Sequence, residues 1–258
     1  MLDRREFLRT NIAAMNERID AARRAAGRTD SVDLVVVTKT YPASDVDLLA
    51  DLGIRDVGEN RDQEAKAKKL ATTKGNLRWH MIGRLQRNKV NSVARWADVV
   101  ESVDREVLVN PLADAVWKAG REGPLQVLIQ VDLEYGVDDP DTDEGTDESA
   151  AAEPGSRSAT GRGGAPVGAV TNIAAAVDSR AELELAGVMA VAPHPDTGID
   201  PLAAFTRLAQ VAADLRARWP RATTISAGMS QDLEQAIACG ATQVRVGGAI
   251  LGQRASVQ

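Results

Sequence analysis

Short apolar runs alternate along the sequence with segments of helical periodicity, and this alternation constrains the fold more than any other feature. About eight such runs are expected to form strands, and each precedes a segment expected to be helical. Alternating strands and helices produce parallel strands that are joined by right-handed crossovers. The expected strands are Leu34–Thr38, Arg55–Val57, Arg78–Ile82, Asp98–Glu101, Leu125–Val131, Ala186–Val191, Thr223–Ser226 and Gln243–Val246.

One further helix is expected before the first strand, at Arg4–Ala26. Eight strand–helix units in 258 residues match the usual length of a (β/α)8 barrel. We therefore expect an α/β protein, a (β/α)8 TIM barrel with an additional N-terminal helix that forms a single domain over residues 1–258. A doubly wound open sheet is the alternative, although such sheets usually have fewer strands. Among the helices that follow strands, Ser44 is a candidate N-cap for Ser44–Leu52, and Ser230 is one for Gln231–Cys239.

Composition narrows the classes of partner. The formal net charge of −6 and the pI near 5.1 give no electrostatic footprint for nucleic acid or for an anionic membrane. The single cysteine, Cys239, cannot form an internal disulfide framework, and the N-terminal segment lacks the apolar stretch of a signal peptide. We expect a cytoplasmic protein without membrane spans.

Residues Asp138–Gly168 interrupt the pattern. The segment is rich in Asp, Glu, Gly, Ser and Pro and has almost no large apolar residue. It cannot bury enough surface to offset the entropy of ordering, so we expect a disordered or mobile insertion. A regulatory role is the alternative to an inert insertion.

Active sites of barrels lie at the carboxyl ends of the strands. Seven groups of residues are expected there: Lys39, Glu59 with Asn60, His80 with Gly83, Asp132, Met189, Ser226–Ser230 and Arg245–Gly248. A lysine, an arginine, an amide and two glycine-containing turns would then face a common space.

The turns after the seventh and eighth expected strands favour phosphate binding. Gly228 permits a positive φ, Ser226 and Ser230 offer hydroxyls, and Gly247 with Gly248 can expose successive N–H groups. Barrels often bind phosphate at this position. For either turn alone, ordinary helix capping and a tight turn are the stronger explanation, whereas the two turns together at these strands favour phosphate.

Lys39 then has a chemical role. A lysine that is desolvated at a strand end has a lowered pKa, and its neutral amine can attack an aldehyde. An aldehyde that carries a phosphate suggests pyridoxal 5'-phosphate (PLP), whose pyridine nitrogen needs a protein partner. Arg245 is the candidate partner, with a structural ion pair as the alternative. An arginine there would leave the nitrogen unprotonated, so strong catalysis is not implied.

Other polar residues are more ambiguous. His80 could be an acid or base, but a core histidine bonded to the backbone is the stronger interpretation. Asn60 could line a cofactor ring or cap the next helix. Cys239 is interpreted as packing, and the charges of residues 63–69 as a solvated helix face.

Several motifs resemble the pyridoxal phosphate homeostasis protein family. They include VVVTKTYP, GENRDQE, WHMIGRLQRNK, GMSQDLEQAI and VRVGGAILGQR, and the match runs in order from about Val32 to Arg254 apart from the insertion. The resemblance implies an alanine racemase-like barrel, PLP fold type III. It also implies a Schiff base between the cofactor and Lys39, and Arg245 facing the pyridine nitrogen. The implied phosphate turns are Ser226–Ser230, which includes Gly228 and Met229, and Gly247–Gly248.

The resemblance further implies a cytosolic protein, often a monomer, that binds, buffers or delivers PLP without established catalysis. PLP-dependent apoenzymes are the implied partners. Three positions depart from the family pattern: Gly248 replaces a usual Thr or Ser, Arg84 replaces a proline, and Arg162 is separated from Glu134 by the insertion. A hydroxyl contact to the phosphate is therefore lost at Gly248, although the backbone donor remains, and a basic contact from the loop after the fifth strand is not implied.

Two other functions compete with homeostasis. A PLP-dependent amino-acid racemase needs a base on each face of its substrate, and Lys39 could supply one. Related racemases take the second base, a tyrosine, from a partner subunit with an additional β domain that this sequence lacks. Its own tyrosines, Tyr41 and Tyr135, are not obvious second bases. A Schiff-base aldolase acting on a phosphosugar would use Lys39 without a cofactor, but leaves Arg245 and the family motifs unexplained.

Overall fold

The computed structural model describes residues 3–134 and 163–252 and shows a closed barrel of eight parallel strands, ordered β1 to β8. The strands are β1 Asp33–Val37, β2 Asp56–Glu59, β3 Arg78–Met81, β4 Val99–Val103, β5 Leu125–Gln130, β6 Leu183–Met189, β7 Thr224–Ser226 and β8 Gln243–Val246. β8 pairs with β1 and closes the ring, with Val246 beside Val36. The predicted barrel is therefore confirmed, and the open sheet is excluded.

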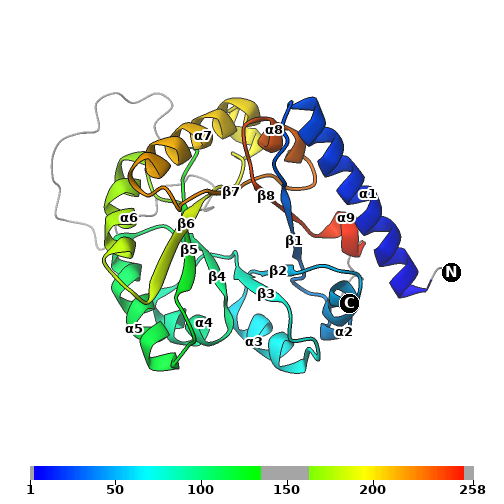
Figure 1. The fold of residues 1–258 in the computed structure, drawn as a ribbon, viewed down its shortest axis with the longest axis horizontal. Helices are drawn as coiled ribbons and strands as arrows, with labels where there is room; N and C mark the ends of the chain where they lie inside the picture. Colours follow the sequence, from blue (N-terminus) through cyan, green and yellow to red (C-terminus); the bar gives the residue numbers. More distant parts are fainter. Residues whose placement is uncertain (1–2, 135–162, 253–258) are drawn as a thin grey trace.

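Helices surround the barrel (Figure 1). They are α1 Arg4–Ala25, α2 Ala43–Asp51, α3 Asp62–Ala71, α4 Val90–Trp96, α5 Val109–Ala119, α6 Val170–Asp178, α7 Pro201–Arg218, α8 Leu233–Ala238 and α9 Gly248–Leu251. Short 3-10 turns lie at Arg87–Lys89, Glu106–Leu108, Val167–Ala169 and Pro195–Thr197. The predicted N-terminal helix is confirmed as α1, which packs outside the ring against α8 and α9.

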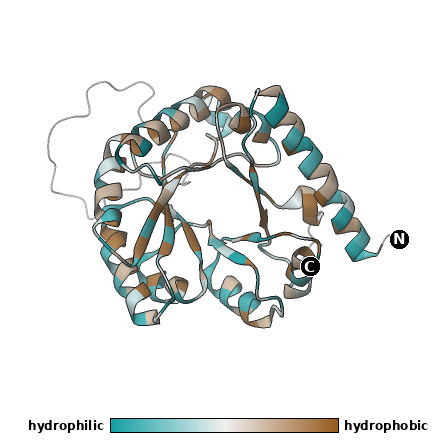
Figure 2. Cartoon of the chain, viewed as in Figure 1, coloured by the Kyte–Doolittle hydropathy of each residue, from teal (hydrophilic) through white to brown (hydrophobic). Residues whose placement is uncertain are grey.

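Apolar side chains fill two regions. The larger region combines buried residues of the strands with buried residues of the surrounding helices. Hydrophobic residues are present along both kinds of element (Figure 2). A smaller cluster of Val99, Leu128 and Met189, from β4, β5 and β6, forms a separate buried group. Strands buried on both faces are typical of parallel sheets. Side chains alternate along each strand between the outside and the inside of the barrel. The inward-facing positions that are not part of this small apolar cluster can therefore carry polar groups.

Local corrections concern caps and one strand. Helix α2 has Pro42 as its N-cap, so Ser44 lies within the helix. Helix α8 has Asp232 as its N-cap, so Ser230 precedes the cap. Both N-cap predictions were wrong because the helices begin elsewhere than expected: α2 begins at Ala43, before Ser44, and α8 begins only at Leu233. β6 begins three residues earlier than expected, and its pairing with β5 shifts at an irregularity beside Gly187.

The predicted insertion, residues 138–168, lies outside the described residues up to residue 162. Its last part is attached to the barrel. The Ala165 N–H donates to the carbonyl of Gln130 at 2.7 Å, and the Asp132 N–H donates to the carbonyl of Ala165 at 2.9 Å. The Gln130 side chain donates to the carbonyl of Gly163 at 3.0 Å. The chain therefore returns to the end of β5 before α6 begins.

Within the described residues, no helix combines the length and the apolar character that crossing a bilayer requires.

Candidate functional site

All nine residues predicted to bind the cofactor lie on or just after four neighbouring strands, β7, β8, β1 and β2. They are Lys39, Asn60, Ser226, Gly228, Met229, Ser230, Arg245, Gly247 and Gly248. Seven of them follow strand ends, whereas Ser226 and Arg245 lie within β7 and β8. Because the strands are parallel, the barrel brings these positions to one half of its carboxyl mouth.

Lys39 is half-buried and follows β1 by two residues. The next residue, Thr40, has a φ of +71° and is the one described residue other than glycine with a positive φ. A β-branched residue in this conformation is a true outlier and must be held by its surroundings. The turn that carries Lys39 is therefore strained.

Charged residues of α3 lie beside this turn. Lys68 is buried, and its Nζ donates to Oε1 of Glu59 at 2.5 Å and to the carbonyl of Thr38 at 2.7 Å. The interpretation of residues 63–69 as a solvated face was therefore wrong at Lys68. The helical spacing explains why Lys68 is buried, because the buried residues of α3, which are Asp62, Ala65 and Lys68, lie three positions apart on one face.

A chain of polar side chains crosses the inside of the barrel. Glu101 on β4 is fully buried and accepts from Ser226 on β7 at 2.6 Å and from Gln243 on β8 at 2.8 Å. Ser226 also accepts from Gln243 at 2.9 Å and from Arg245 at 2.6 Å. Strands β4 and β7 are not neighbours, so only side chains that point into the barrel can make these bonds.

Arg245 is held at the end of this chain. Its Nη1 donates to Ser226 and lies 3.8 Å from Oε2 of Glu101, and its Nη2 donates to the carbonyl of Ala190 at 2.7 Å. Burial lowers the pKa of Arg245, and this is opposed by the negative charges of Glu101 and Asp232. The ion pair that was the alternative for Arg245 is thus present, and it fixes the guanidinium in place.

His80 is at the other end of the chain and is fully buried. Its Nδ1 lies 2.6 Å from Oε1 of Glu101, and its Nε2 lies 2.9 Å from Oδ1 of Asp56. Burial opposes protonation, but the hydrogen bonds to Asp56 and Glu101 outweigh it and raise the pKa of His80. The prediction of a core histidine is confirmed, whereas backbone partners were wrong because two carboxylates take both ring nitrogens.

The turn after β7 is tightly packed. Gly228 has a φ of +92°, and a Cβ there would lie 2.8 Å from Cβ of Ala236 in α8. The carbonyl of Gly228 accepts from the Arg245 N–H at 2.9 Å. The Met229 N–H donates to Oδ1 of Asp232 at 2.5 Å, and Ser230 is half-buried. Ser226 points into the barrel network, so Ser230 is the hydroxyl of this turn that lies nearer the surface.

The turn after β8 lies against β1. A Cβ on Gly247 would lie 3.1 Å from the carbonyl oxygen of Val37, two residues before Lys39. Gly248 is exposed and begins α9. Glycine therefore allows the backbone of this turn to approach the strand that carries the lysine.

Asn60 follows β2, and its Oδ1 is buried without a hydrogen-bond partner in the described structure. Asn60 does not cap α3, because the N-cap of that helix is Arg61. An unpaired buried oxygen calls for an explanation, and a bound group would supply one. Cys239, at the end of α8, packs against the core as predicted.

Sequence reasoning missed Glu101 and Gln243, the hub of the interior network. A carboxylate among the valines of the strand VVESV was the available signal for Glu101. Nothing in the sequence indicates that Gln243 on β8 meets Glu101 on β4, because that contact depends on barrel closure.

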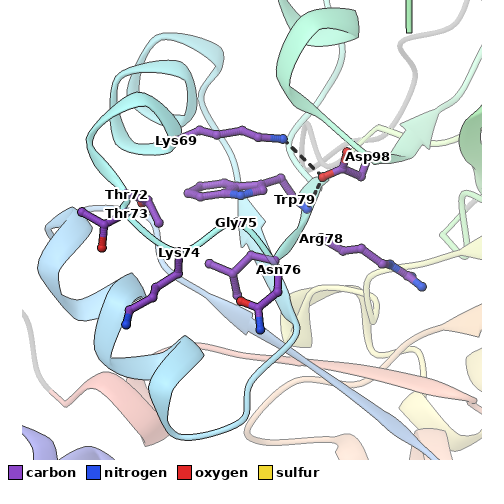
Figure 3. A pocket seen from close by; sticks show the side chains of 10 residues that line it. Lys69, Thr72, Thr73, Lys74, Gly75, Asn76, Arg78, Trp79 and Asp98 are labelled. Atoms are coloured by element: carbon purple, nitrogen blue, oxygen red, sulfur yellow. Dashed lines mark hydrogen bonds and ion pairs between the residues drawn. The ribbon is translucent and has the colours of Figure 1, made fainter. Parts of the chain in front are cut away.

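A surface pocket of about 520 Å³ lies at the opposite, amino-terminal end of the barrel (Figure 3). Its lining includes Lys69, Lys74, Arg78, Trp79 and Asp98. Each cation there already has a carboxylate partner: Lys69 pairs with Asp98, Lys74 with Asp51 and Arg78 with Asp56. Among residues 3–134 and 163–252, no three or more His, Cys, Asp or Glu side chains lie together in a group that could hold a metal ion. The carboxyl mouth is therefore the candidate site.

The fold and the mouth define an alanine racemase-like barrel. The family model for the N-terminal domain of alanine racemase matches residues 156–255. The solved structure of PipY from Synechococcus elongatus PCC7942, described as having PLP bound, is 28% identical with a TM-score of 0.74, and the match covers 95% of this chain and 100% of that one.

Sequence relatives are closer still. A pyridoxal phosphate homeostasis protein of Mycobacterium tuberculosis is 40% identical over 98% of this chain and 95% of its own length. The protein of that name from Escherichia coli K12 is 33% identical over 95% of each chain. The chain belongs to the pyridoxal phosphate homeostasis protein family, as the sequence motifs indicated.

Proposed function

We propose that this protein binds PLP as a Schiff base on Lys39 and takes part in intracellular PLP (vitamin B6) homeostasis without catalysing a reaction of its own. Family membership and the PLP described for PipY support the cofactor. The observation that carries the proposal is local. The half-buried Lys39 follows β1 by two residues, and the glycine turn of β8 lies against the end of that strand, where a Cβ on Gly247 would be 3.1 Å from the carbonyl oxygen of Val37.

The residues present fit the cofactor. Asn60 has a buried oxygen without a partner in the described structure, at the end of the strand next to β1. Ser230 and the Gly247–Gly248 backbone would hold the phosphate, with Gly228 shaping the turn. Arg245 would contact the ring. Ser226 would contribute indirectly, because its hydroxyl accepts a hydrogen bond from Arg245 and so helps to hold the guanidinium. The Met229 N–H already donates to Asp232.

When bound, PLP supplies an aldehyde with which a lysine amine condenses to a Schiff base, with loss of one water. Condensation requires that Lys39 present an unprotonated amine. Arg245 only donates hydrogen bonds, so a ring nitrogen beside it would accept one and carry no proton. An unprotonated ring would be a weaker electron sink, so strong catalysis is not implied.

The racemase alternative lacks support at Tyr41. Its hydroxyl donates to the carbonyl of Gly252 at 2.7 Å, which engages the phenol in a structural contact. Tyr135 lies outside the described residues. We expect no racemisation of L-alanine above the level of a PLP-only control, and turnover that depends on Lys39 would overturn the non-catalytic part of the proposal.

The binding test uses the purified protein reconstituted with PLP. We expect visible absorbance that borohydride bleaches and a reduced label that maps to Lys39. Lys39→Ala should abolish the label but keep the melting temperature of the cofactor-free protein. Lys118→Ala, at an exposed lysine of α5, is the matched control and should label like the wild type. A protein that stays colourless, or a label on another lysine, would contradict the proposal.

We further propose a cytoplasmic monomer that delivers PLP to apoenzymes. Sedimentation equilibrium tests the monomer. Delivery is tested by activation of a PLP-dependent apoenzyme, which should proceed with the loaded wild-type protein even when a scavenger removes free PLP.

A further inference from the structure

Lys68 is a buried cation whose three protons have three acceptors. Its side chain is 5% exposed, and Nζ lies 2.7 Å from the carbonyl of Thr38, 2.5 Å from Oε1 of Glu59 and 3.1 Å from Oε1 of Glu64. An ammonium group has three donors and no acceptor, so these contacts satisfy it completely. A lysine buried in this way is rare unless it is paired, as it is here.

The contacts of this cluster fall on both sides of Lys39. Before it, the Thr38 carbonyl accepts from Lys68, and the Thr38 hydroxyl donates to Oε1 of Glu59 at 2.5 Å. After it, the Thr40 N–H donates to Oε1 of Glu64. Helix α3 therefore anchors the residue before Lys39 and the residue after it.

The anchored turn is strained at Thr40. The φ of +71° is costly for a β-branched residue and persists only where the surroundings enforce it. Thr40 is itself exposed, so packing around its side chain does not enforce the conformation. The Tyr41 N–H donates to the carbonyl of Thr38 at 3.0 Å and closes the turn through the backbone. The hydrogen bond from the Thr40 N–H to Glu64, which is in turn paired with Lys68, adds a side-chain contact at Thr40 itself.

We propose that Lys68 and Glu64 are positioning residues, which hold the strained Thr38–Thr40 turn so that Lys39 presents its amine to an aldehyde at the barrel mouth. This inference rests on the proposed function, because it concerns how readily Lys39 forms the covalent bond. The amine adds to the aldehyde and one water leaves, and neither Lys68 nor Glu64 gains or loses an atom in that step.

The test measures the rate of covalent adduct formation after PLP is added to cofactor-free protein. Lys68→Met removes the charge and the three hydrogen bonds while retaining an unbranched side chain of similar length. We expect adduct formation about tenfold slower than in the wild type, with the label still on Lys39. Lys69→Met is the matched control, since the neighbouring Lys69 contacts Trp96 and Asp98 toward the other end of the barrel (Figure 3). It should react at the wild-type rate.

A rescue variant separates positioning from general destabilisation. Asparagine adopts the left-handed conformation far more readily than threonine does. Adduct formation in the double variant Lys68→Met with Thr40→Asn should therefore be at least about threefold faster than in Lys68→Met alone. It should leave the melting temperature of the Lys68→Met variant largely unchanged. A simple loss of stability would not respond in this way.

Glu64→Ala provides a second route if Lys68→Met does not fold. The Glu64 side chain is 26% exposed, so its removal should leave the core intact while releasing the Thr40 N–H. A slower reaction is expected here as well. Wild-type rates in Glu64→Ala, or in a folded Lys68→Met, would overturn this inference, as would a rescue variant that recovers nothing. If the wild type itself forms no adduct on Lys39, the proposed function fails instead.

Discussion

The Ser226 hydroxyl on β7 donates to Oε2 of Glu101 on β4 at 2.6 Å, across the inside of the barrel. Through Ser226, Glu101 is linked to Arg245, and through its other oxygen it is linked to His80. Positive and negative groups therefore alternate from Asp56 to Arg245. The interior of this barrel is a charged network beside a small apolar cluster, and the network determines where the arginine of the candidate site lies.

Ser226→Ala should destabilise the protein. It leaves Gln243 and Arg245 without their shared acceptor and removes a donor from Glu101, and unsatisfied buried polar groups cost about 1–3 kcal/mol. Ser179→Ala is the control, because that exposed hydroxyl donates only to the carbonyl of Ala176 and should matter by less than about 0.5 kcal/mol. Urea unfolding of both variants measures the difference. Equal stabilities would show that the network contributes nothing.

The contribution of His80 to stability should fall as the pH rises. Its pKa is raised in the folded protein, because the hydrogen bonds to Asp56 and Glu101 outweigh burial. The stabilisation by protonated His80 should be fully present below the unfolded pKa of about 6.5 and lost as the pH passes the folded pKa. The free-energy difference between wild type and His80→Gln, measured by urea unfolding from about pH 5.5 upward, should decrease with pH.

His194→Gln is the matched control for that series, since His194 is part-exposed and lies near Asp196 in a loop. Its difference from the wild type should stay small throughout. A His80→Gln difference that is constant would show that the pKa of His80 is the same in the folded and unfolded protein, and one that grows with pH would show that folding lowers it. Either result would contradict the prediction.

Gly228→Ala should cost more than Gly240→Ala. Both glycines have a positive φ, +92° and +101°, so alanine is strained at each. At Gly228 the new Cβ would also lie 2.8 Å from Cβ of Ala236 and 3.0 Å from Cα of Leu233, whereas nothing lies within 4 Å at Gly240. We expect a loss of about 1 kcal/mol at Gly240 and about 1–3 kcal/mol more at Gly228. Thermal unfolding gives the comparison, and equal losses would mean that α8 moves freely.

The fold could be predicted because strand and helix periodicities are local properties of the sequence. The strand-end rule then brought Lys39, Asn60 and the two glycine turns to one mouth. The register shift between β5 and β6 near Gly187 could not be predicted, because it appears only when the two strands pair. A Cβ on Gly187 would lie 1.9 Å from the carbonyl oxygen of Thr224 in β7, so this position requires glycine.

The polar interior could not be predicted for a related reason. Glu101 and Ser226 are 125 residues apart, and their contact exists only after the barrel has closed. Lys68 on α3 was misinterpreted because two of its partners are distant in the sequence. Glu59 is the last residue of β2, and the Thr38 carbonyl follows β1. Spacing along α3 placed Lys68 on the same stripe as the buried Ala65, but lysine at such a position is usually exposed.

Arg245 variants separate the geometry of its contacts from its charge. The guanidinium reaches Ser226 and the Ala190 carbonyl at the same time, through Nη1 and Nη2. Arg245→Lys retains the charge beside Glu101 but replaces the planar fork by a point charge, and we expect a loss of about 1–3 kcal/mol. Arg245→Met also leaves Glu101 with less compensation inside the barrel, which raises the expected loss to about 3–5 kcal/mol.

Covalent labelling of Lys39 by PLP should persist in Arg245→Lys, because the bond forms at the lysine. Urea unfolding and borohydride labelling measure the two effects separately. If Arg245→Met were no less stable than Arg245→Lys, the pairing with Glu101 at 3.8 Å would contribute nothing to the fold.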